Sequence, residues 1–263
     1  MIVLGCSGSG PGPNSPASGY LVEAGAARFV LDLGNGTLSA LARHLDPWRL
    51  DAVVFSHLHA DHCADFTGLA VHRRYHPRPP VDPAAHRLAV YAPAAAPERF
   101  AAAYACDETE RAVTDLTDVF DFHPVTDGSR VSVGDATVRA AAVDHPCDAY
   151  ALRVEHGGAS LVYSGDTGPC EGLVELARGA DVLLCEAAWP HVTPQWDEPP
   201  PGVHLSGRQA GEHAAAAGVG RLLITHVPAW YDGEQMLAEA RAAYDGPVEL
   251  VVPDGSYPIS PRS

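Results

Sequence analysis

The 263-residue chain is long enough to bury a full hydrophobic core, and because no linker-like stretch divides it, we expect one domain spanning residues 1–263. The 17 basic and 33 acidic residues give a formal net charge of −16, which disfavours long nucleic acids as partners. No segment resembles a membrane span, and six scattered cysteines without a C-x-x-C pair favour reduced thiols and a cytoplasmic location.

Short apolar runs separated by turn residues characterise the first part of the chain. A Gly/Pro/Ser-rich loop spans 7–18, and the sequence Gly-Asn-Gly at 34–36 marks a turn. These patterns predict strands at 2–5, 20–22, 29–31, 53–55 and 88–91, and helices at 37–44 and 97–105.

The second part of the chain begins with strands and then alternates strands with helices. Strands are predicted at 119–123, 130–133, 137–143, 150–154, 160–163, 182–185 and 222–224, and helices at 171–177, 207–217 and 234–244. Ser206 and Gln209 have the spacing of a capping box at the start of one helix. Two groups of strands, each accompanied by helices, predict an α/β (α+β) protein with two sheets face to face and helices outside.

One stretch, residues 56–65, carries most of the chemical information. It contains His57, His59, Asp61 and His62 directly after the apolar run 53–55. Residues two apart at a strand end point to the same side, so His57 and His59 can bind one ion while Asp61 and His62 face a second. The segment therefore predicts two adjacent metal sites.

The other ligands of such sites are expected at strand ends, where a rigid backbone can aim them. Three residues satisfy this condition: His145 follows the strand at 137–143, Asp166 follows 160–163, and His226 follows 222–224.

Together with Asp32, these residues resemble, in chain order, the metal-binding pattern of metallo-β-lactamase-fold hydrolases. The resemblance implies a four-layer αββα sandwich with two divalent metal ions, zinc first and manganese as the alternative. It implies that one ion is held by His57, His59 and His145, the other by Asp61, His62 and His226, and that Asp166 bridges them. Asp32 is expected to orient ligands rather than to bind metal.

The motifs Cys185-Glu186-Ala187-Ala188 and His204-Leu205-Ser206 resemble those of the ribonuclease Z-like phosphodiesterase branch of this fold. In that branch the histidine, paired with the glutamate, stabilises the transition state and protonates the leaving oxygen. The resemblance therefore implies Glu186 and His204 as catalytic residues. In the mechanism that we expect at the two metal sites, Asp61 is the third catalytic residue and accepts a proton from the attacking water.

One departure bears on the substrate. Ribonuclease Z carries a long tRNA-binding arm between the histidine and the bridging aspartate, but here Asp166 follows His145 by only 166 − 145 = 21 positions, enough for a strand pair around Gly157-Gly158. The early motif at 5–9 and the motif at 15–20 are similar to actinobacterial cyclic-nucleotide phosphodiesterases. These features predict hydrolysis of a small phosphodiester, with a 3′,5′-cyclic nucleotide such as cyclic AMP as first choice.

Three alternatives stay open: a ribonuclease Z-type tRNA 3′-processing endonuclease, a lactone or thioester hydrolase, and a non-enzymatic metal-binding regulatory protein. The sequence also leaves open whether the chain forms a homodimer.

Two groups of side chains have an undecided role. A basic segment with Arg73 and Arg74 fits either a solvated helix end or a phosphate-steering group. Four aromatic residues fit either base stacking or apolar packing: Trp189, Trp196, Trp230 and Tyr231.

Overall fold

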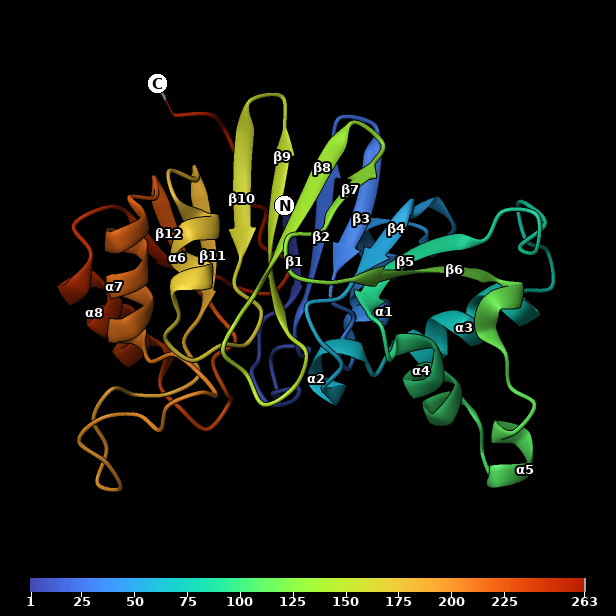
Figure 1. The fold of residues 1–263 in the computed structure, drawn as a ribbon, viewed down its shortest axis with the longest axis horizontal. Coiled ribbons are helices and arrows are strands. Elements are labelled where there is room, and N and C mark those ends of the chain that lie inside the picture. The colour runs from blue at the N-terminus through green and yellow to red at the C-terminus, as the bar shows by residue number, and fades with distance from the viewer. Residues whose placement is uncertain (263) are drawn as a thin grey trace.

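The computed structural model describes residues 1–262 as two β-sheets packed face to face, with helices covering both outer faces (Figure 1). The first sheet has the strand order β1-β2-β3-β4-β5-β6. Its first three strands pair antiparallel, and β3 to β6 are parallel. The strands are β1 Ile2–Gly5, β2 Gly19–Ala24, β3 Ala27–Leu31, β4 Ala52–Val54, β5 Leu88–Pro93 and β6 Phe120–Val125.

The second sheet has the order β13-β12-β11-β10-β9-β8-β7. Strands β10 to β13 are parallel, so their carboxyl ends lie along one edge of the sheet, and β7 to β10 pair antiparallel. The strands are β7 Arg130–Val133, β8 Ala136–Ala142, β9 Tyr150–His156, β10 Ala159–Tyr163, β11 Val182–Glu186, β12 Arg221–Thr225 and β13 Val248–Leu250.

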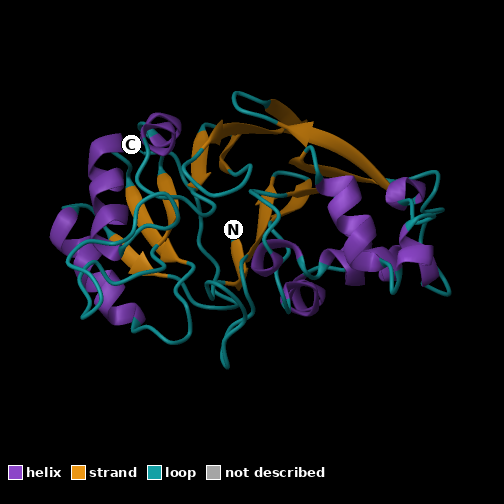
Figure 2. Ribbon diagram, turned by 60° about the horizontal axis from the view of Figure 1, so that its bottom comes forward, coloured by secondary structure: helices purple, strands orange, loops and turns teal. Residues whose placement is uncertain are grey.

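The helices form the two outer layers, as Figure 2 shows from a second direction. Five of the described helices belong to the first half: α1 Thr37–His44, α2 Ala60–Cys63, α3 Phe66–Tyr75, α4 Ala96–Tyr104 and α5 Glu108–Arg111. Three accompany the second sheet: α6 Glu171–Ala177, α7 Gly207–Ala217 and α8 Gly233–Ala243. Within residues 1–262, no helix combines the length and apolar character needed to cross a membrane.

Three apolar layers hold this arrangement together. On β3, Phe29 and Leu31 pack between the two sheets, whereas Val30 packs on the opposite side against the helices of the first half. This alternation follows the pleat of a strand, in which successive side chains point to opposite faces. A third layer lies between the second sheet and α6 to α8. The predicted four-layer αββα sandwich is therefore confirmed.

Helix α7 shows how local sequence sets the packing. Ser206 and Gln209 form the predicted capping box, so the helix begins where the sequence indicates. A Cβ on Gly207 would lie 2.3 Å from the carbonyl oxygen of Met236, and one on Gly211 would lie 2.5 Å from that of Ala240. The two glycines therefore allow α8 to pack directly on the backbone of α7.

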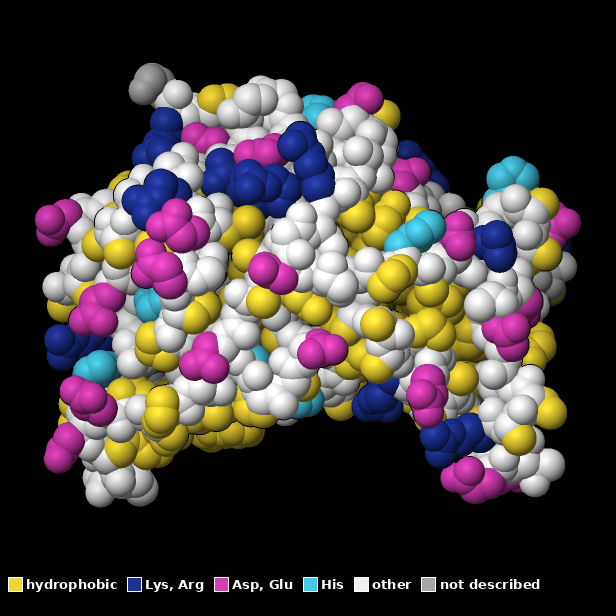
Figure 3. All heavy atoms as spheres, viewed as in Figure 1, with side chains coloured by type: hydrophobic (Ala, Val, Ile, Leu, Met, Phe, Trp, Pro, Cys, Tyr) yellow, Lys and Arg dark blue, Asp and Glu magenta, His cyan; other side chains and the backbone are white. Residues whose placement is uncertain are grey.

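The basic segment at the end of α3 requires a correction. Arg73 is buried, and its guanidinium donates to the carbonyl oxygens of His86 (2.6 Å) and Val119 (3.3 Å). Arg74 pairs with the carboxylate of Asp118. Both guanidinium groups are thus engaged within the fold, so the prediction that they steer a phosphate is wrong. For Arg73, which is buried, the alternative of a solvated helix end is wrong as well. Charged side chains of both signs are spread over the face in Figure 3.

Candidate metal centre

The site lies where loops from both halves of the chain meet. His57 and His59 follow β4, Asp61 and His62 lie on α2, and Asp32 follows β3. From the second sheet come His145 after β8, Asp166 after β10, Glu186 at the end of β11 and His226 after β12. Because β10, β11 and β12 are parallel and adjacent, their carboxyl ends deliver three of these side chains to one edge.

Asp32 organises the loop that carries the first histidines. Its carboxylate accepts hydrogen bonds from the backbone N–H of Ser56 (2.7 Å) and the Ser56 hydroxyl (2.7 Å). It also lies 2.7 Å from Nδ1 of His62 and accepts from the hydroxyl of Tyr163 at 2.8 Å. Asp32 is fully buried, and both of its carboxylate oxygens are engaged by these partners, as expected for a residue that orients ligands.

The first group of candidate ligands consists of His57, His59, His145 and Asp166, whose ligand atoms all lie within 4.8 Å of one another. Nδ1 of His59 lies 3.1 Å from Nε2 of His57 and 3.1 Å from Nε2 of His145. Three imidazole nitrogens therefore point toward a common position. His59 is exposed, which leaves this side of the group open to solvent.

The second group consists of Asp61, His62, Asp166 and His226, again with all ligand atoms within 4.8 Å. Nε2 of His62 lies 3.1 Å from Oδ1 of Asp166, and Nε2 of His226 lies 3.4 Å from Oδ2 of the same residue. Asp166 belongs to both groups. The two groups are the two ligand sets that the sequence resemblance implies, brought together by the fold.

Four of the histidines, all except His59, are held by their other ring nitrogen. Nδ1 of His57 lies 3.0 Å from the Ser56 hydroxyl, and Nδ1 of His226 lies 2.8 Å from the Ser18 hydroxyl. Nδ1 of His145 donates to the carbonyl oxygen of Val203 at 2.9 Å. Such contacts fix the orientation of a metal-binding ring. Ser18 lies in the motif at 15–20 and Ser56 in the stretch 56–65, but neither residue was predicted from the sequence to hold a ligand.

The residues present fit a metal centre. Nε2 of His62, Oδ1 of Asp166 and Nε2 of His226 are buried and make no hydrogen bond within residues 1–262. Leaving buried polar atoms unpaired costs about 1–3 kcal/mol each, so such atoms normally have a partner. Imidazole nitrogens and carboxylate oxygens that converge without hydrogen-bond partners are the donor set of a divalent metal ion such as zinc.

The electrostatics keep most of these groups in their metal-binding forms. Burial lowers the pKa of His57 well below its usual value and lowers that of His226 to about 4, so both rings are neutral at pH 7. Burial opposes ionisation of Asp166, but the neighbouring His226 and His62 hold its pKa well below the ordinary range. His62 is the exception, because Asp166 and Asp32 outweigh its burial and raise its pKa.

Glu186 and His204 form a pair beside this cluster. Oε2 of Glu186 lies 3.0 Å from Nδ1 of His204, and Oε1 accepts the backbone N–H of Thr167 at 2.6 Å. Burial raises the pKa of Glu186 to about 7. Burial disfavours the charged form of His204, but the charge and hydrogen bond of Glu186 prevail and raise its pKa to about 9.

The position of His204 also fits a metal ligand. Asp166, Glu186, His204 and His226 form a third group whose ligand atoms lie within 4.8 Å. The ring of His204 lies 5.7 Å from the rings of both His145 and His226, which places it next to both predicted metal sites. A role as proton donor and a role as ligand both fit this position, and metal analysis distinguishes them.

The four aromatic residues do not form one group. Trp189 contacts the site, with its ring 5.2 Å from that of His204 in an edge-on arrangement. Trp196 packs on Trp189 and donates its indole N–H to the carbonyl oxygen of Pro190. Trp230 is 67% exposed, and Tyr231 lines a separate cavity. Trp189 is therefore the aromatic residue that the fold places beside the catalytic candidates.

The two-sheet sandwich and its histidine–aspartate cluster define a metal-dependent hydrolase. Residues 20–227 match the family described as the beta-lactamase superfamily domain, and the chain belongs to this family. The predicted metallo-β-lactamase fold and enzyme class are thereby confirmed.

Relatives extend over nearly the whole chain. An uncharacterized protein of Mycobacterium leprae is 49% identical over 261 residues, covering 98% of this chain and 88% of that protein. Ribonuclease Z of Mycobacterium bovis is 33% identical over 267 residues, covering 95% of this chain and 94% of that enzyme. The crystal structure of the metallo-beta-lactamase fold protein YhfI from Bacillus subtilis has a TM-score of 0.81 and 26% identity, with 97% of both chains covered.

Proposed function

We propose that the protein is a metal-dependent phosphodiesterase that hydrolyses a small phosphodiester, with a 3′,5′-cyclic nucleotide such as cyclic AMP as the preferred substrate. The observation that carries the proposal is the Glu186–His204 pair, whose histidine nitrogen lies 3.8 Å from Oδ2 of Asp166. A protonated histidine beside a metal cluster suits cleavage of a phosphodiester, whose alkoxide leaving group needs a proton.

In this proposal the ligands are divided between two ions. His57, His59 and His145 would hold one, Asp61, His62 and His226 the other, and Asp166 would contribute to both. Zinc is the first choice for this mixture of imidazole and carboxylate ligands, and manganese the alternative. Bound ions would supply Lewis acidity at the phosphoryl oxygens and lower the pKa of water to near neutrality.

The chain itself would move the protons. Because Nδ1 of His204 is engaged by Glu186, Nε2 is the atom that would donate to the departing ribose oxygen. Glu186 is fully buried and fixed by Thr167, so it holds the imidazole in one orientation. Asp61 lies at the cluster, with Oδ2 3.5 Å from Nε2 of His62, and we assign it the second task of accepting a proton from the attacking water.

The size of the substrate follows from what lies between His145 and Asp166. The 20 residues at 146–165 form a short loop and the hairpin of β9 and β10, which turns at Gly157-Gly158, so the predicted strand pair is confirmed. The hairpin leaves no residues there for an arm that could hold a tRNA. The net charge of −16 adds repulsion for any polyanion that extends beyond the metal cluster.

A second candidate function is tRNA 3′ processing of the ribonuclease Z type. It is favoured by the 33% identity with the Mycobacterium bovis enzyme, which extends over 95% of this chain. It requires that a surface other than the missing arm bind the tRNA body. Lactone or thioester hydrolysis would use the same ligands but give no task to Glu186 and His204.

A substrate panel separates these functions. Purified protein is analysed for bound metal and then assayed with cyclic AMP, cyclic GMP, bis-p-nitrophenyl phosphate, a precursor tRNA and a lactone. We expect turnover of a cyclic nucleotide well above that of the tRNA and the lactone. Rapid cleavage of the tRNA without turnover of either cyclic nucleotide would establish the second candidate instead.

The role of His204 has its own test. His204→Ala should slow hydrolysis of cyclic AMP by about 10²- to 10⁴-fold, the usual contribution of a general acid. Hydrolysis of bis-p-nitrophenyl phosphate should fall much less, because p-nitrophenolate leaves without a proton. His123→Ala, which removes a partly exposed histidine on β6, is the matched control and should change neither rate. Equal losses on both substrates would remove the acid role, and loss of bound metal would make His204 a ligand.

A further inference from the structure

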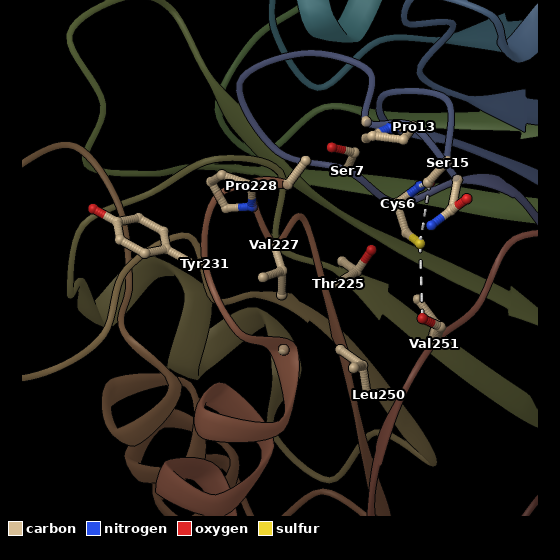
Figure 4. A pocket seen from close by; sticks show the side chains of 14 residues that line it. Cys6, Ser7, Pro13, Ser15, Thr225, Val227, Pro228, Tyr231, Leu250 and Val251 are labelled. Atoms are coloured by element: carbon tan, nitrogen blue, oxygen red, sulfur yellow. Dashed lines mark hydrogen bonds between the residues drawn. The ribbon is translucent and has the colours of Figure 1, made fainter.

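A cavity of about 430 Å³ lies beside the metal cluster but is not part of it. Its walls come from Cys6, which follows β1, from the loop at 7–15, from the carboxyl ends of β12 and β13 with the residues after them, and from the first residue of α8 (Figure 4). The volume falls within the range of small-molecule binding sites. None of the candidate metal ligands lines the cavity.

The lining has no charge. The 14 residues around the cavity include no aspartate, glutamate, lysine, arginine or histidine, in a chain where 19% of residues are charged. Val227, Pro228, Tyr231 and Leu250 give it a largely apolar surface. A charged ligand would lose its hydration here without gaining a partner, so the lining selects an uncharged molecule with an apolar body.

Ser7 supplies one unused polar group. Its hydroxyl oxygen is buried and has no hydrogen-bond partner within residues 1–262, and the residue is 4% exposed. The Ser7 backbone is fixed, since its N–H donates to the carbonyl oxygen of Pro16 at 3.1 Å. A Cβ on Gly12 would lie 3.4 Å from the Ser7 hydroxyl, so the glycine leaves space beside a hydroxyl that is itself buried. A buried hydroxyl of this kind is normally satisfied, and a ligand in the cavity would supply the missing partner.

The wall between the cavity and the metal cluster is a single stretch of backbone. Thr225 and Val227 face the cavity, while the ring of His226, between them, faces Asp166. The loop closes against this wall at Gly8, where a Cβ would lie 2.4 Å from the carbonyl oxygen of His226. The cavity and the metal cluster are therefore neighbouring but separate spaces.

We propose that this cavity is a second binding site, for a small uncharged ring compound that carries one hydroxyl or amide group. The ring contacts the apolar wall formed by Val227, Tyr231 and Leu250, and the polar group forms a hydrogen bond with the Ser7 hydroxyl. The site does not depend on the reaction catalysed at the metal cluster, and it holds its ligand while the substrate position is occupied.

Phenol, toluene and benzoate test the three parts of this proposal, because they share a ring and differ in one group. Binding to the metal-loaded full chain is followed by backbone amide shifts in two-dimensional NMR spectra. We expect phenol to bind with a dissociation constant on the order of 1 mM, as is usual for a ligand of this size, with shifts centred on Ser7 and Val227. Toluene should bind about 3- to 10-fold more weakly for lack of the hydrogen bond, and benzoate should not bind.

Two variants assign the binding to this cavity. Ser7→Ala should make phenol and toluene bind equally while leaving the unfolding temperature unchanged or higher, because it removes an unsatisfied hydroxyl. Ser15→Ala is the matched control: its hydroxyl already accepts from Cys6 N–H and donates to the Pro16 carbonyl, so its loss should lower the unfolding temperature but preserve the preference for phenol. Leu250→Trp, which puts a larger ring into the apolar wall, should narrow the cavity and weaken binding of both probes.

Saturating inorganic phosphate, an anionic probe for the metal cluster, should leave the affinity for phenol unchanged. Competition between phosphate and phenol, or amide shifts centred on His59 and Asp61, would show that the ring enters the hydrolytic site and would overturn the proposal. Equal affinity of wild-type protein for phenol and toluene, or no binding of phenol at tens of millimolar, would overturn it as well. None of these outcomes depends on whether cyclic nucleotides are substrates.

Discussion

Replacing Asp32 by asparagine tests whether the metal cluster is held in place by its buried supports. Asparagine has the same shape and, like aspartate, tolerates the positive φ of 57° observed here, so the backbone is preserved. Aspartate accepts four hydrogen bonds in the structure. The amide of asparagine has one oxygen and one NH₂ group, so at least one donor among Ser56, His62 and Tyr163 must face another donor.

The cost can be estimated from these contacts. One buried donor left unsatisfied costs about 1–3 kcal/mol, and the remaining bonds lose the extra strength of an ionised acceptor. We expect Asp32→Asn to lower the free energy of unfolding of the metal-free protein by about 2–4 kcal/mol. Because His62 loses its orienting partner, the affinity for zinc should fall about 10- to 100-fold.

The measurements are urea unfolding of the metal-free protein and competition for zinc against a chromophoric chelator. Tyr163→Phe is the matched control, because it removes one of the four donors and keeps the carboxylate. It should cost about 1 kcal/mol and leave the zinc affinity within a few-fold of wild type. A zinc affinity of Asp32→Asn within twofold of wild type would refute the orienting role.

Three further predictions concern other parts of the structure. Gly34→Ala should lower the free energy of unfolding in urea by about 3 kcal/mol or more, because its Cβ would lie 1.9 Å from the carbonyl oxygen of Asp61. Gly157→Ala, whose Cβ would have no atom within 4 Å, should cost only about 1 kcal/mol of backbone strain. Burial opposes ionisation of Asp181, but hydrogen bonds from Ser160 and the Arg262 N–H lower its pKa. The stability that this carboxylate contributes is therefore present above the ordinary aspartate pKa of about 3.9 and is lost as pH falls further. Asp181→Asn should lower the free energy of unfolding at pH 7, and the difference from wild type should shrink below about pH 4. Removal of metal with a chelator should lower the unfolding temperature by several degrees in calorimetry, and titration with zinc should restore it at two ions per chain.

The elements that the sequence predicted best are those with explicit boundary residues. The helices at 37–44, 171–177 and 207–217 have the predicted bounds, the last because Ser206, Gln209 and Gly218 determine both of its ends. For helix α3 the sequence indicated at most a helix end near Arg73 and Arg74, without bounds. Its buried face is formed by Phe66, Leu69, Ala70 and Arg73, and a buried arginine at the last of these positions disguises the apolar periodicity. Strand β13 was missed because it is a three-residue edge strand.

At the site, too, some residues could be predicted from the sequence and others depend on tertiary contacts. Side chains with a strong chemical identity, such as His145 and Asp166, could be identified as candidates because each follows a predicted strand. The group that orients His145 could not be predicted. Its Nδ1 donates to the backbone carbonyl of Val203, and because every residue has such a carbonyl, the residue type does not indicate the contact. Likewise, the burial of Arg73 under Trp48 depends on tertiary packing that connects residues far apart in the chain.

The supports of the metal cluster also join the two halves of the molecule. Asp32, from the first sheet, accepts a hydrogen bond from Tyr163 of the second, and Ser18 holds His226. The cluster can therefore form only when the two sheets are packed together, which couples metal affinity to the stability of the whole fold. Substrate choice cannot come from this shared framework. In our proposal it depends on the Glu186–His204 pair and on the short connection before Asp166.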